Sequence, residues 1–288
     1  MSTVRDKMKT IKDITIDTER AFYNNKETSF TNIKIDGPAD GESAFKECSN
    51  ITVTDSFFNL RYPFWHCTNL AISNIEMTEN CRASLWYDYS VDIKDSKMLG
   101  IKAFRECNKI KIENCEIVSP EFGLRCADII FKNSSLDSVY AFFECKNLIL
   151  ENIKFVGKYS FQYVENMNIV NSELDTKDAF WHTKNVTVKD SIIKGEYLGW
   201  YSENLTLINC KIIGTQPLCY CKNLKLIDCT TEDCDLAFEY SEVNGSVIGD
   251  VVSVKNPLSG KLTISGKTTL IVDENDRSNN KFELIYNR

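Results

Sequence analysis

The chain is built from short segments in which apolar and polar residues alternate, as in Ile51/Val53, Leu148/Leu150 and Val186/Val188. Alternation with a period of two is typical of a strand with one buried face. Each segment ends at an Asn or Asp, and a small residue, an apolar residue and an aromatic-rich stretch follow it. The pattern therefore predicts three short strands per unit, with bends where Asn or Asp side chains bond the local backbone.

These units recur with a period of 19. The first Asn of the motif falls at 147, 166, 185, 204 and 223, and the same spacing runs backwards through Asp128, Lys109 and Ser90. One longer step, of 21, then leads to Asn69, and one more step of 19 leads to Asn50. Five positions after each of these residues the chain always has Asn or Asp: Asp55, Asn74, Asp95, Asn114, Asn133, Asn152, Asn171, Asp190, Asn209 and Asp228. A period of this kind is the signature of a solenoid.

Three strands in each unit, with no helical stretch, predict an all-β fold: a right-handed parallel β-helix whose coils stack at about 4.8 Å. The rival is a leucine-rich repeat, because LTLINCKI at 205–212 resembles the core of its consensus. That fold needs a helix or 3₁₀ segment in each repeat, where this chain has Phe, Trp, Tyr and Ala at strand-like spacing. A left-handed hexapeptide helix is disfavoured, since 19 is not a multiple of six.

We expect one domain over residues 1–288. Residues 1–26 are predicted to form an N-terminal cap, 27–240 the coils, and 241–288 irregular strands that close the other end, because an open stack exposes strand edges. Two insertions interrupt the repeat, at 35–43 and at 78–84.

Charge and composition narrow the possible partners. The formal net charge is −7 and the pI is near 5.1, which argues against nucleic acid and anionic membranes as partners. There is no apolar run of transmembrane length and no signal peptide, so we expect a cytoplasmic protein. Twelve cysteines then indicate free thiols, and their recurrence at equal offsets predicts compact core fillers. No phosphate-binding, dinucleotide-binding, zinc or calcium motif is present in the sequence, so we expect no cofactor and no metal.

Four segments carry a resemblance to a known family: DGPADGESAFKE at 36–47, NLRYPFWH at 59–66, YSFQY at 159–163 and KIIGTQPLCYC at 211–221. They resemble an uncharacterised bacterial family of β-helix proteins and, at the level of fold, the pectin-lyase-like superfamily. The resemblance covers most of 20–240 and implies the fold and a bacterial origin. It supplies no catalytic residues, so carbohydrate chemistry enters only by analogy of fold.

Stacked coils place residues at equal offsets in ladders. One ladder, rich in Phe at positions such as Phe45, Phe64 and Phe104, is predicted to be core. A ladder two positions later is polar or amphipathic in every coil and predicts a solvent-facing strip: Glu47, His66, Tyr87, Glu106, Arg125, Glu144, Tyr163, His182, Tyr201, Tyr220 and Glu239. The first and the third offset would share a face in a flat strand, so a bend is expected between them.

The strip and its neighbours form the candidate site. Glu106 and Glu144 should lie two steps of about 4.8 Å apart, near the upper end of the range for inverting glycoside hydrolysis, about 6.5–9.5 Å. The alternative is that Glu-Arg-Glu is an ion-pair ladder that avoids stacking like charges. The candidate catalytic residues are Glu47, His66, Arg105, Glu106, Arg125 and Glu144, and the candidate substrate-binding residues are Arg61, Tyr62, Trp65, Arg82, Trp86 and Tyr87.

The two insertions favour the N-terminal coils, since loops on a rigid scaffold commonly carry function. His66 lies beside them, whereas His182, the other histidine of the chain, is six coils and about 29 Å away. Three hypotheses follow. The first is a carbohydrate-active enzyme, either a glycoside hydrolase or a lyase, acting on an intracellular oligosaccharide. The alternative is a non-catalytic scaffold that binds a glycan or a protein, and the third is a self-associating solenoid.

Overall fold

The computed structural model describes residues 8–37, 42–273 and 281–286. These residues form strands and turns and no helix, so the leucine-rich repeat is excluded and the parallel β-helix is confirmed. Among them no helix is long and apolar enough to cross a membrane. The chain divides into two compact units, Met1–Ile130 (unit 1) and Phe131–Arg288 (unit 2), and each is described by itself.

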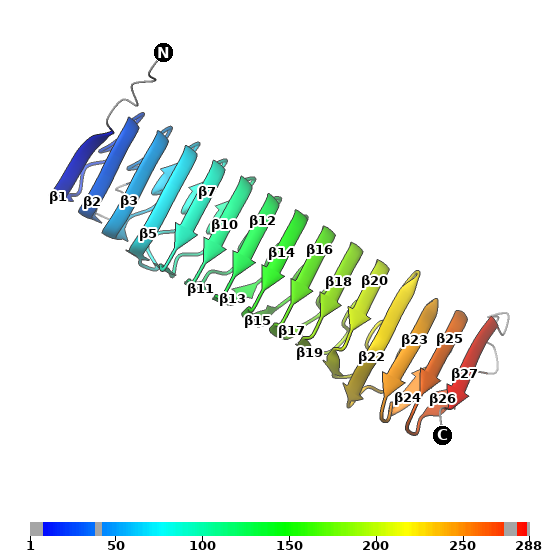
Figure 1. The fold of residues 1–288 in the computed structure, drawn as a ribbon. Coiled ribbons are helices and arrows are strands. Elements are labelled where there is room, and N and C mark those ends of the chain that lie inside the picture. Colours follow the sequence, from blue (N-terminus) through cyan, green and yellow to red (C-terminus); the bar gives the residue numbers. More distant parts are fainter. Residues whose placement is uncertain (1–7, 38–41, 274–280, 287–288) are drawn as a thin grey trace, which may run out of the picture. The chain divides into compact units, whose positions relative to one another are not determined.

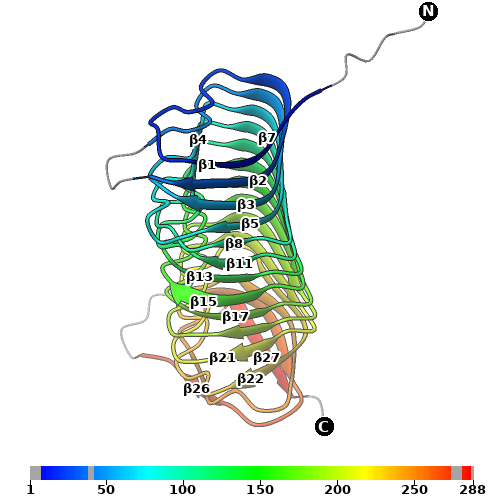
Figure 2. The same cartoon turned by 90° about the vertical axis from the view of Figure 1, so that its left-hand side faces the viewer.

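Unit 1 is a stack of parallel coils (Figures 1 and 2). Its first coils are carried by the long strands β1 (Lys9–Ile16), β2 (Lys26–Asp36), β3 (Ser49–Asn59) and β5 (Thr68–Met77). The later coils have two strands in place of one: β7 (Tyr89–Lys94) with β8 (Lys97–Met98), and β10 (Asn108–Glu113) with β11 (Glu116–Val118). Short third strands are β4 (Phe64–Trp65), β6 (Leu85–Trp86) and β9 (Phe104–Arg105), and β12 (Ala127–Lys132) reaches the boundary of the units.

The insertions lengthen single coils without disturbing the register. Thr28 pairs with Ile51, a step of 23, and Leu70 pairs with Val91, a step of 21. The other steps in unit 1 are 19, as in Ile51 with Leu70. The parallel pairing of the strands therefore continues on both sides of each insertion.

Unit 2 repeats the same coil with steps of 19, so that Leu148, Met167, Val186 and Leu205 pair in turn. Its first rows are β14 (Lys146–Glu151), β16 (Glu165–Val170), β18 (Lys184–Lys189) and β20 (Glu203–Ile208). Its second rows are β13 (Ser135–Val139), β15 (Lys154–Lys158), β17 (Glu173–Lys177), β19 (Ile192–Lys194) and β21 (Lys211–Ile213). The final coils are β22 (Leu224–Glu232), β23 (Val243–Ile248), β24 (Ser253–Lys255), β25 (Ser259–Ile264), β26 (Thr269–Ile271) and β27 (Lys281–Tyr286).

The recurring Asn or Asp turns each coil through a left-handed backbone conformation. All ten have positive φ, between 49° in Asn209 and 56° in Asn152. Asn and Asp tolerate this region better than other residues with a side chain, because their short polar groups bond locally. Their side chains also bond from coil to coil, as in Asn74 Nδ2 to Asp55 Oδ1 at 2.6 Å. Asn or Asp therefore recurs because the backbone of every coil has a left-handed residue at this position.

The aromatic-rich third segment differs from the prediction of a strand in every coil. In unit 1 it forms a strand of two residues in three coils (β4, β6 and β9) and a turn at 44–47, and in unit 2 it is a series of turns. The reason lies in the backbone, since Phe161 and Tyr163 have φ values of 61° and 59°. Two left-handed residues so close together prevent an extended strand. A left-handed residue also explains the bend expected between the first and third offsets. His66 has a φ of 55°, and its side chain is exposed although that of Phe64, two residues earlier, is buried.

The core is continuous along each unit. The Phe45 and Phe64 rings stack 5.0 Å apart in unit 1, and the Phe161 and Phe180 rings stack 5.1 Å apart in unit 2. All twelve cysteines are free and buried, as predicted. Burial raises the pKa of the Cys81 thiol to about 11, so it is protonated and unreactive at neutral pH. The burial of all twelve agrees with the prediction that they fill the core.

Candidate functional site

Six of the predicted residues form one aromatic cluster on unit 1: Tyr62, Trp65, His66, Trp86, Tyr87 and Arg105. The Trp65 and Trp86 rings stack 5.1 Å apart, and the His66 and Tyr87 rings stack 4.9 Å apart. Tyr62 lies 4.8 Å from the Trp65 ring. The Arg105 guanidinium lies 5.0 Å from the Trp86 ring.

The rings of this aromatic cluster are engaged mainly with one another and with the scaffold. Trp65 Nε1 donates to the carbonyl of Ala83 at 2.8 Å, and Trp86 Nε1 donates to that of Lys102 at 2.9 Å. The Trp86 ring lies between the Trp65 ring and the Arg105 guanidinium. Stacking on a sugar ring would need an uncovered face, so this geometry favours a structural role for Trp86.

The predicted acids and arginines are spread over several coils. Glu47 accepts a hydrogen bond from Tyr23 Oη at 2.8 Å, which raises the pKa of that phenol, and Glu106 lies 3.4 Å from Arg105 Nε. Glu47 and Glu106 are three coils apart, about 14 Å, which exceeds the separation of about 6.5–9.5 Å used in inverting hydrolysis.

The remaining predicted residues are half-buried or exposed. Arg61 lies 3.7 Å from Glu42, and Arg82 and Arg125 are exposed. Glu144 is exposed on unit 2, so its pairing with Glu106 stays a prediction. Part of the first insertion, 38–41, lies outside the described residues.

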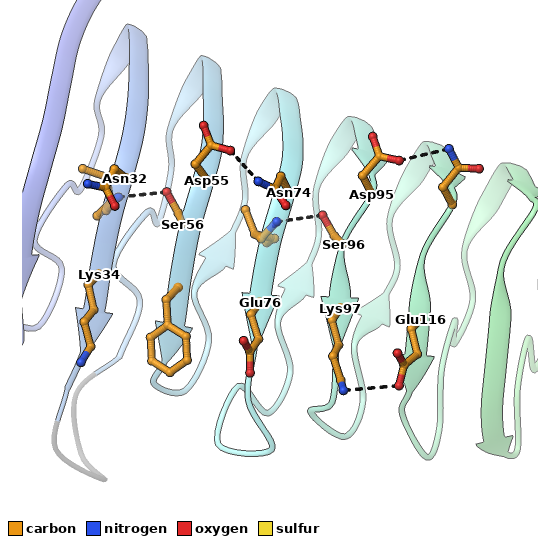
Figure 3. A pocket seen from close by; sticks show the side chains of 14 residues that line it. Asn32, Lys34, Asp55, Ser56, Asn74, Glu76, Asp95, Ser96, Lys97 and Glu116 are labelled. Atoms are coloured by element: carbon orange, nitrogen blue, oxygen red, sulfur yellow. Dashed lines mark hydrogen bonds and ion pairs between the residues drawn. The ribbon is translucent and has the colours of Figure 1, made fainter.

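A second feature of unit 1 is a groove of about 780 Å³ on another side of the coils (Figure 3). We call it the corner groove, because it follows the bend at the recurring Asn or Asp. Its rim residues are Asn32, Asp55, Asn74, Asp95 and Asn114. The opposite row is Lys34, Phe57, Glu76, Lys97 and Glu116, and the floor is Ile33, Ser56, Ile75 and Ser96.

The corner groove follows directly from the left-handed bend. Each rim residue has a φ between 50° and 55°, its side chain points outward, the next residue points into the core, and the one after that points outward again. Two outward rows therefore flank a buried floor. The floor is held by Ser56 Oγ, which accepts a hydrogen bond from the Ile33 amide at 3.0 Å, and by Ser96 Oγ, which accepts one from Ile75 at 3.2 Å.

Most polar groups of the corner groove have partners. On the rim, Asn114 Nδ2 donates to Asp95 Oδ1 at 3.1 Å, in the manner of Asn74 and Asp55. In the opposite row, Lys97 Nζ lies 3.4 Å from Glu116. Figure 3 shows this ion pair beside Glu76, whose side chain makes no hydrogen bond or ion pair within the described part of the chain.

Lys34 is engaged twice. Its Nζ lies 3.1 Å from Asp36 and 5.6 Å from the centre of the Phe57 ring. Hydrogen bonding to Asn59 and to Lys34 holds the pKa of Asp36 below its usual value. Glu76 is thus the acid of the corner groove that has no hydrogen bond or ion pair among the described residues, whereas Asp55, Asp95 and Glu116 each have one.

Sequence reasoning placed the site on the aromatic cluster and missed the corner groove. The available signal was the invariant Asn or Asp together with the variable row two positions later. Alternation alone could not reveal a groove, because it predicts which side chains point outward but not whether the backbone between them curves inward.

The same corner forms a smaller hollow in unit 2, of about 290 Å³. Its rim is Asp190, Asn209 and Asp228, and its opposite row contains Ile192, Lys211 and Thr230. The corner is therefore general, and the row that follows it sets its chemistry.

A family model described as "Protein of unknown function (DUF3737)" matches residues 9–285. No curated protein sequence matches this chain. A mutant tailspike protein of E. coli bacteriophage HK620, described in complex with pentasaccharide, is similar in structure at 10% identity and a TM-score of 0.52, over 96% of this chain and 72% of that chain. A double mutant of that tailspike is similar at 10% identity and a TM-score of 0.56, and the match covers 96% of this chain and 73% of the tailspike chain. Likeness at this identity shows the fold alone, and it agrees with the β-helix expected from the sequence.

Proposed function

Because this chain belongs to the DUF3737 family of proteins of unknown function, we propose its function from the geometry of its surface: it binds an oligosaccharide along the corner groove, without cleaving it. The observation that carries the proposal is the groove itself, about 780 Å³ of open, polar-lined space on a rigid stack of coils. Its five coils span four steps of about 4.8 Å, or about 19 Å, which suits a chain of several sugar residues.

The lining of the corner groove supports a polyhydroxylated ligand. The rim offers amide and carboxylate groups in every coil, and the opposite row adds lysine and glutamate. Sugar hydroxyls both donate and accept hydrogen bonds, so a mixed lining of this kind can satisfy them. Phe57 is half-buried in the opposite row and adds an apolar contact. That a tailspike of this fold is described in complex with pentasaccharide is consistent with the proposal, by fold alone.

The acids of the corner groove favour binding over hydrolysis. A glycosidase needs a general acid whose pKa is raised, commonly by an apolar environment. Asp55, Glu76, Asp95 and Glu116 are all solvent-exposed. Two of them accept amide hydrogen bonds and a third is ion-paired. None of these four acids therefore lies in an apolar environment of that kind.

The proposal is tested by isothermal titration calorimetry against a panel of neutral, acidic and amine-bearing oligosaccharides. The double variant Phe57→Ala/Asn74→Gly should weaken binding by about tenfold or more, equivalent to about 1.4 kcal/mol. The matched control is Ile192→Ala/Asn209→Gly, at the same corner of unit 2, which should bind normally. Equal loss in both double variants, or none in either, would contradict the assignment to the corner groove. Chromatography after long incubation should show an intact ligand, and a shorter product would mean catalysis.

A further inference from the structure

We infer that the ligand of the corner groove carries protonated amines, as a de-N-acetylated hexosamine oligosaccharide does, and that Glu76 determines this specificity. The inference rests on the proposed function. It starts from the charges that line the groove: two lysines, Lys34 and Lys97, against four carboxylates, Asp55, Glu76, Asp95 and Glu116. The groove therefore has a net charge of −2 before a ligand binds.

Both cations of the corner groove are already neutralised by the protein. Lys97 is paired with Glu116, and Lys34 with Asp36. A ligand with carboxylate or sulfate groups would find no uncommitted lysine here and would meet an excess of negative charge. Acidic glycans are therefore disfavoured.

Three carboxylates lie on three successive coils, since Asp55, Glu76 and Asp95 belong to coils that pair in register. The step between coils is about 4.8 Å, close to the length of one pyranose residue in an extended chain. A glycan with one amine per residue could thus meet one carboxylate per coil. A neutral N-acetylated chain of the same length would have the same shape but no charge to match.

Glu76 is central to this arrangement. It pairs in register with Phe57 on one side and with Lys97 on the other. Its carboxylate is exposed and has no hydrogen bond or ion pair among the described residues, whereas Asp55 and Asp95 each accept an amide hydrogen bond. An ammonium group here would form a charge-assisted hydrogen bond to Glu76, and the adjacent Phe57 ring would favour a cation.

The test compares two hexasaccharides of equal length and linkage, one of glucosamine and one of N-acetylglucosamine. Calorimetry is run slightly below neutral pH, where the amines are protonated and the carboxylates ionised. The wild-type chain should bind the glucosamine chain about tenfold more tightly at low salt, and added salt should reduce this ratio. Glu76→Gln should lower the ratio several-fold with little change in affinity for the N-acetylated chain. The control Glu116→Gln should alter the ratio less, because Glu116 is already paired.

Each outcome separates this inference from the proposed function. Equal affinity for the two hexasaccharides, or tighter binding of a glucuronate oligomer, would overturn the amine specificity but leave glycan binding intact. Displacement of the glucosamine chain by an equal concentration of spermine would show that charge alone is recognised, and would also overturn it. Failure of every oligosaccharide in the panel to bind would overturn the proposed function itself.

Discussion

At the scale of single residues, Asp88 is a buried carboxyl group at a position where the neighbouring coils have a cysteine. Asp88 occupies the position of Cys67 and Cys107 in the coils on either side and is 1% exposed. One carboxyl oxygen accepts a hydrogen bond from the Cys67 amide at 2.6 Å, and the other has no partner among the described residues. Burial therefore raises the pKa of Asp88 well above its usual value.

This carboxyl group should make stability depend on pH. Because the pKa of Asp88 is higher in the folded chain than in the unfolded chain, its contribution is fully present below the unfolded value of about 3.9 and is lost as the pH rises through the folded value. Asp88→Ser, the residue found at the same position as Ser202 and Ser241, should raise the free energy of unfolding near pH 7 by about 1–3 kcal/mol. It should also flatten the decline in melting temperature as the pH rises above about 4. Asp92→Ser, in the same coil but not buried, is the control, and an unchanged pH profile in Asp88→Ser would refute the argument.

The first Asn of the repeat, which also has a left-handed backbone conformation, gives a second test at this scale. Asn185 has a φ of 56°, donates to Asn166 at 3.1 Å and accepts from Asn204 at 2.9 Å. Asn185→Gly keeps the backbone conformation and loses the side-chain bonds, at a cost of about 1 kcal/mol. Asn185→Ala loses the bonds and adds the strain of the left-handed region, so it should cost about 1–2 kcal/mol more. Urea denaturation measures both, and equal values for Gly and Ala would show that the backbone strain is absent.

At the scale of elements, the aromatic cluster and the corner groove show what the alternating pattern can and cannot predict. The pattern correctly predicts that Trp65 and Trp86 face away from the core and lie in adjacent coils. It gives no information on their indole N–H groups, which bond carbonyls of the following turn. Those contacts depend on the path of the turn, and the turn depends on φ values that the pattern does not encode.

The variant Trp86→Ala tests whether the ligand binds at the corner groove or at the aromatic cluster. The variant loses the bond to the Lys102 carbonyl and uncovers Trp65 and Arg105, so it should lower the free energy of unfolding by about 2 kcal/mol, less than for a fully buried tryptophan. Binding of the oligosaccharide in the corner groove should be unchanged, because Trp86 does not line it. Thermal denaturation and calorimetry on one preparation measure both quantities. A loss of affinity for the oligosaccharide with no change in melting temperature would instead place the binding site on the aromatic cluster.

At the scale of the whole molecule, the fold was predictable from the sequence and the corner groove was not, for related reasons. The coil requires a left-handed residue at a fixed place, so Asn or Asp recurs and exposes the period of 19 in the sequence. The lining of a groove has no such requirement, and Lys34, Phe57 and Glu76 follow one another in a single row without any pattern. Residues that recur in every coil therefore meet a requirement of the backbone. Candidate functional residues are better sought at positions of the repeat where the residue type changes from coil to coil.

Equivalence of the coils also makes the number of coils adjustable. Removing 166–184 from unit 2 deletes one whole repeat and joins Glu165 to Asn185, so the next Asn enters the position vacated by Asn166 and every inward residue stays inward. This shortened chain should fold, keep its strand content by circular dichroism and bind the same oligosaccharide, because the corner groove lies in unit 1. Removing 166–183 leaves one residue of the repeat behind, which moves each later strand by one position and turns its apolar face to solvent. That chain should aggregate or unfold at low temperature. If both deletions behaved alike, the stability of the solenoid would not depend on the register that its sequence repeats.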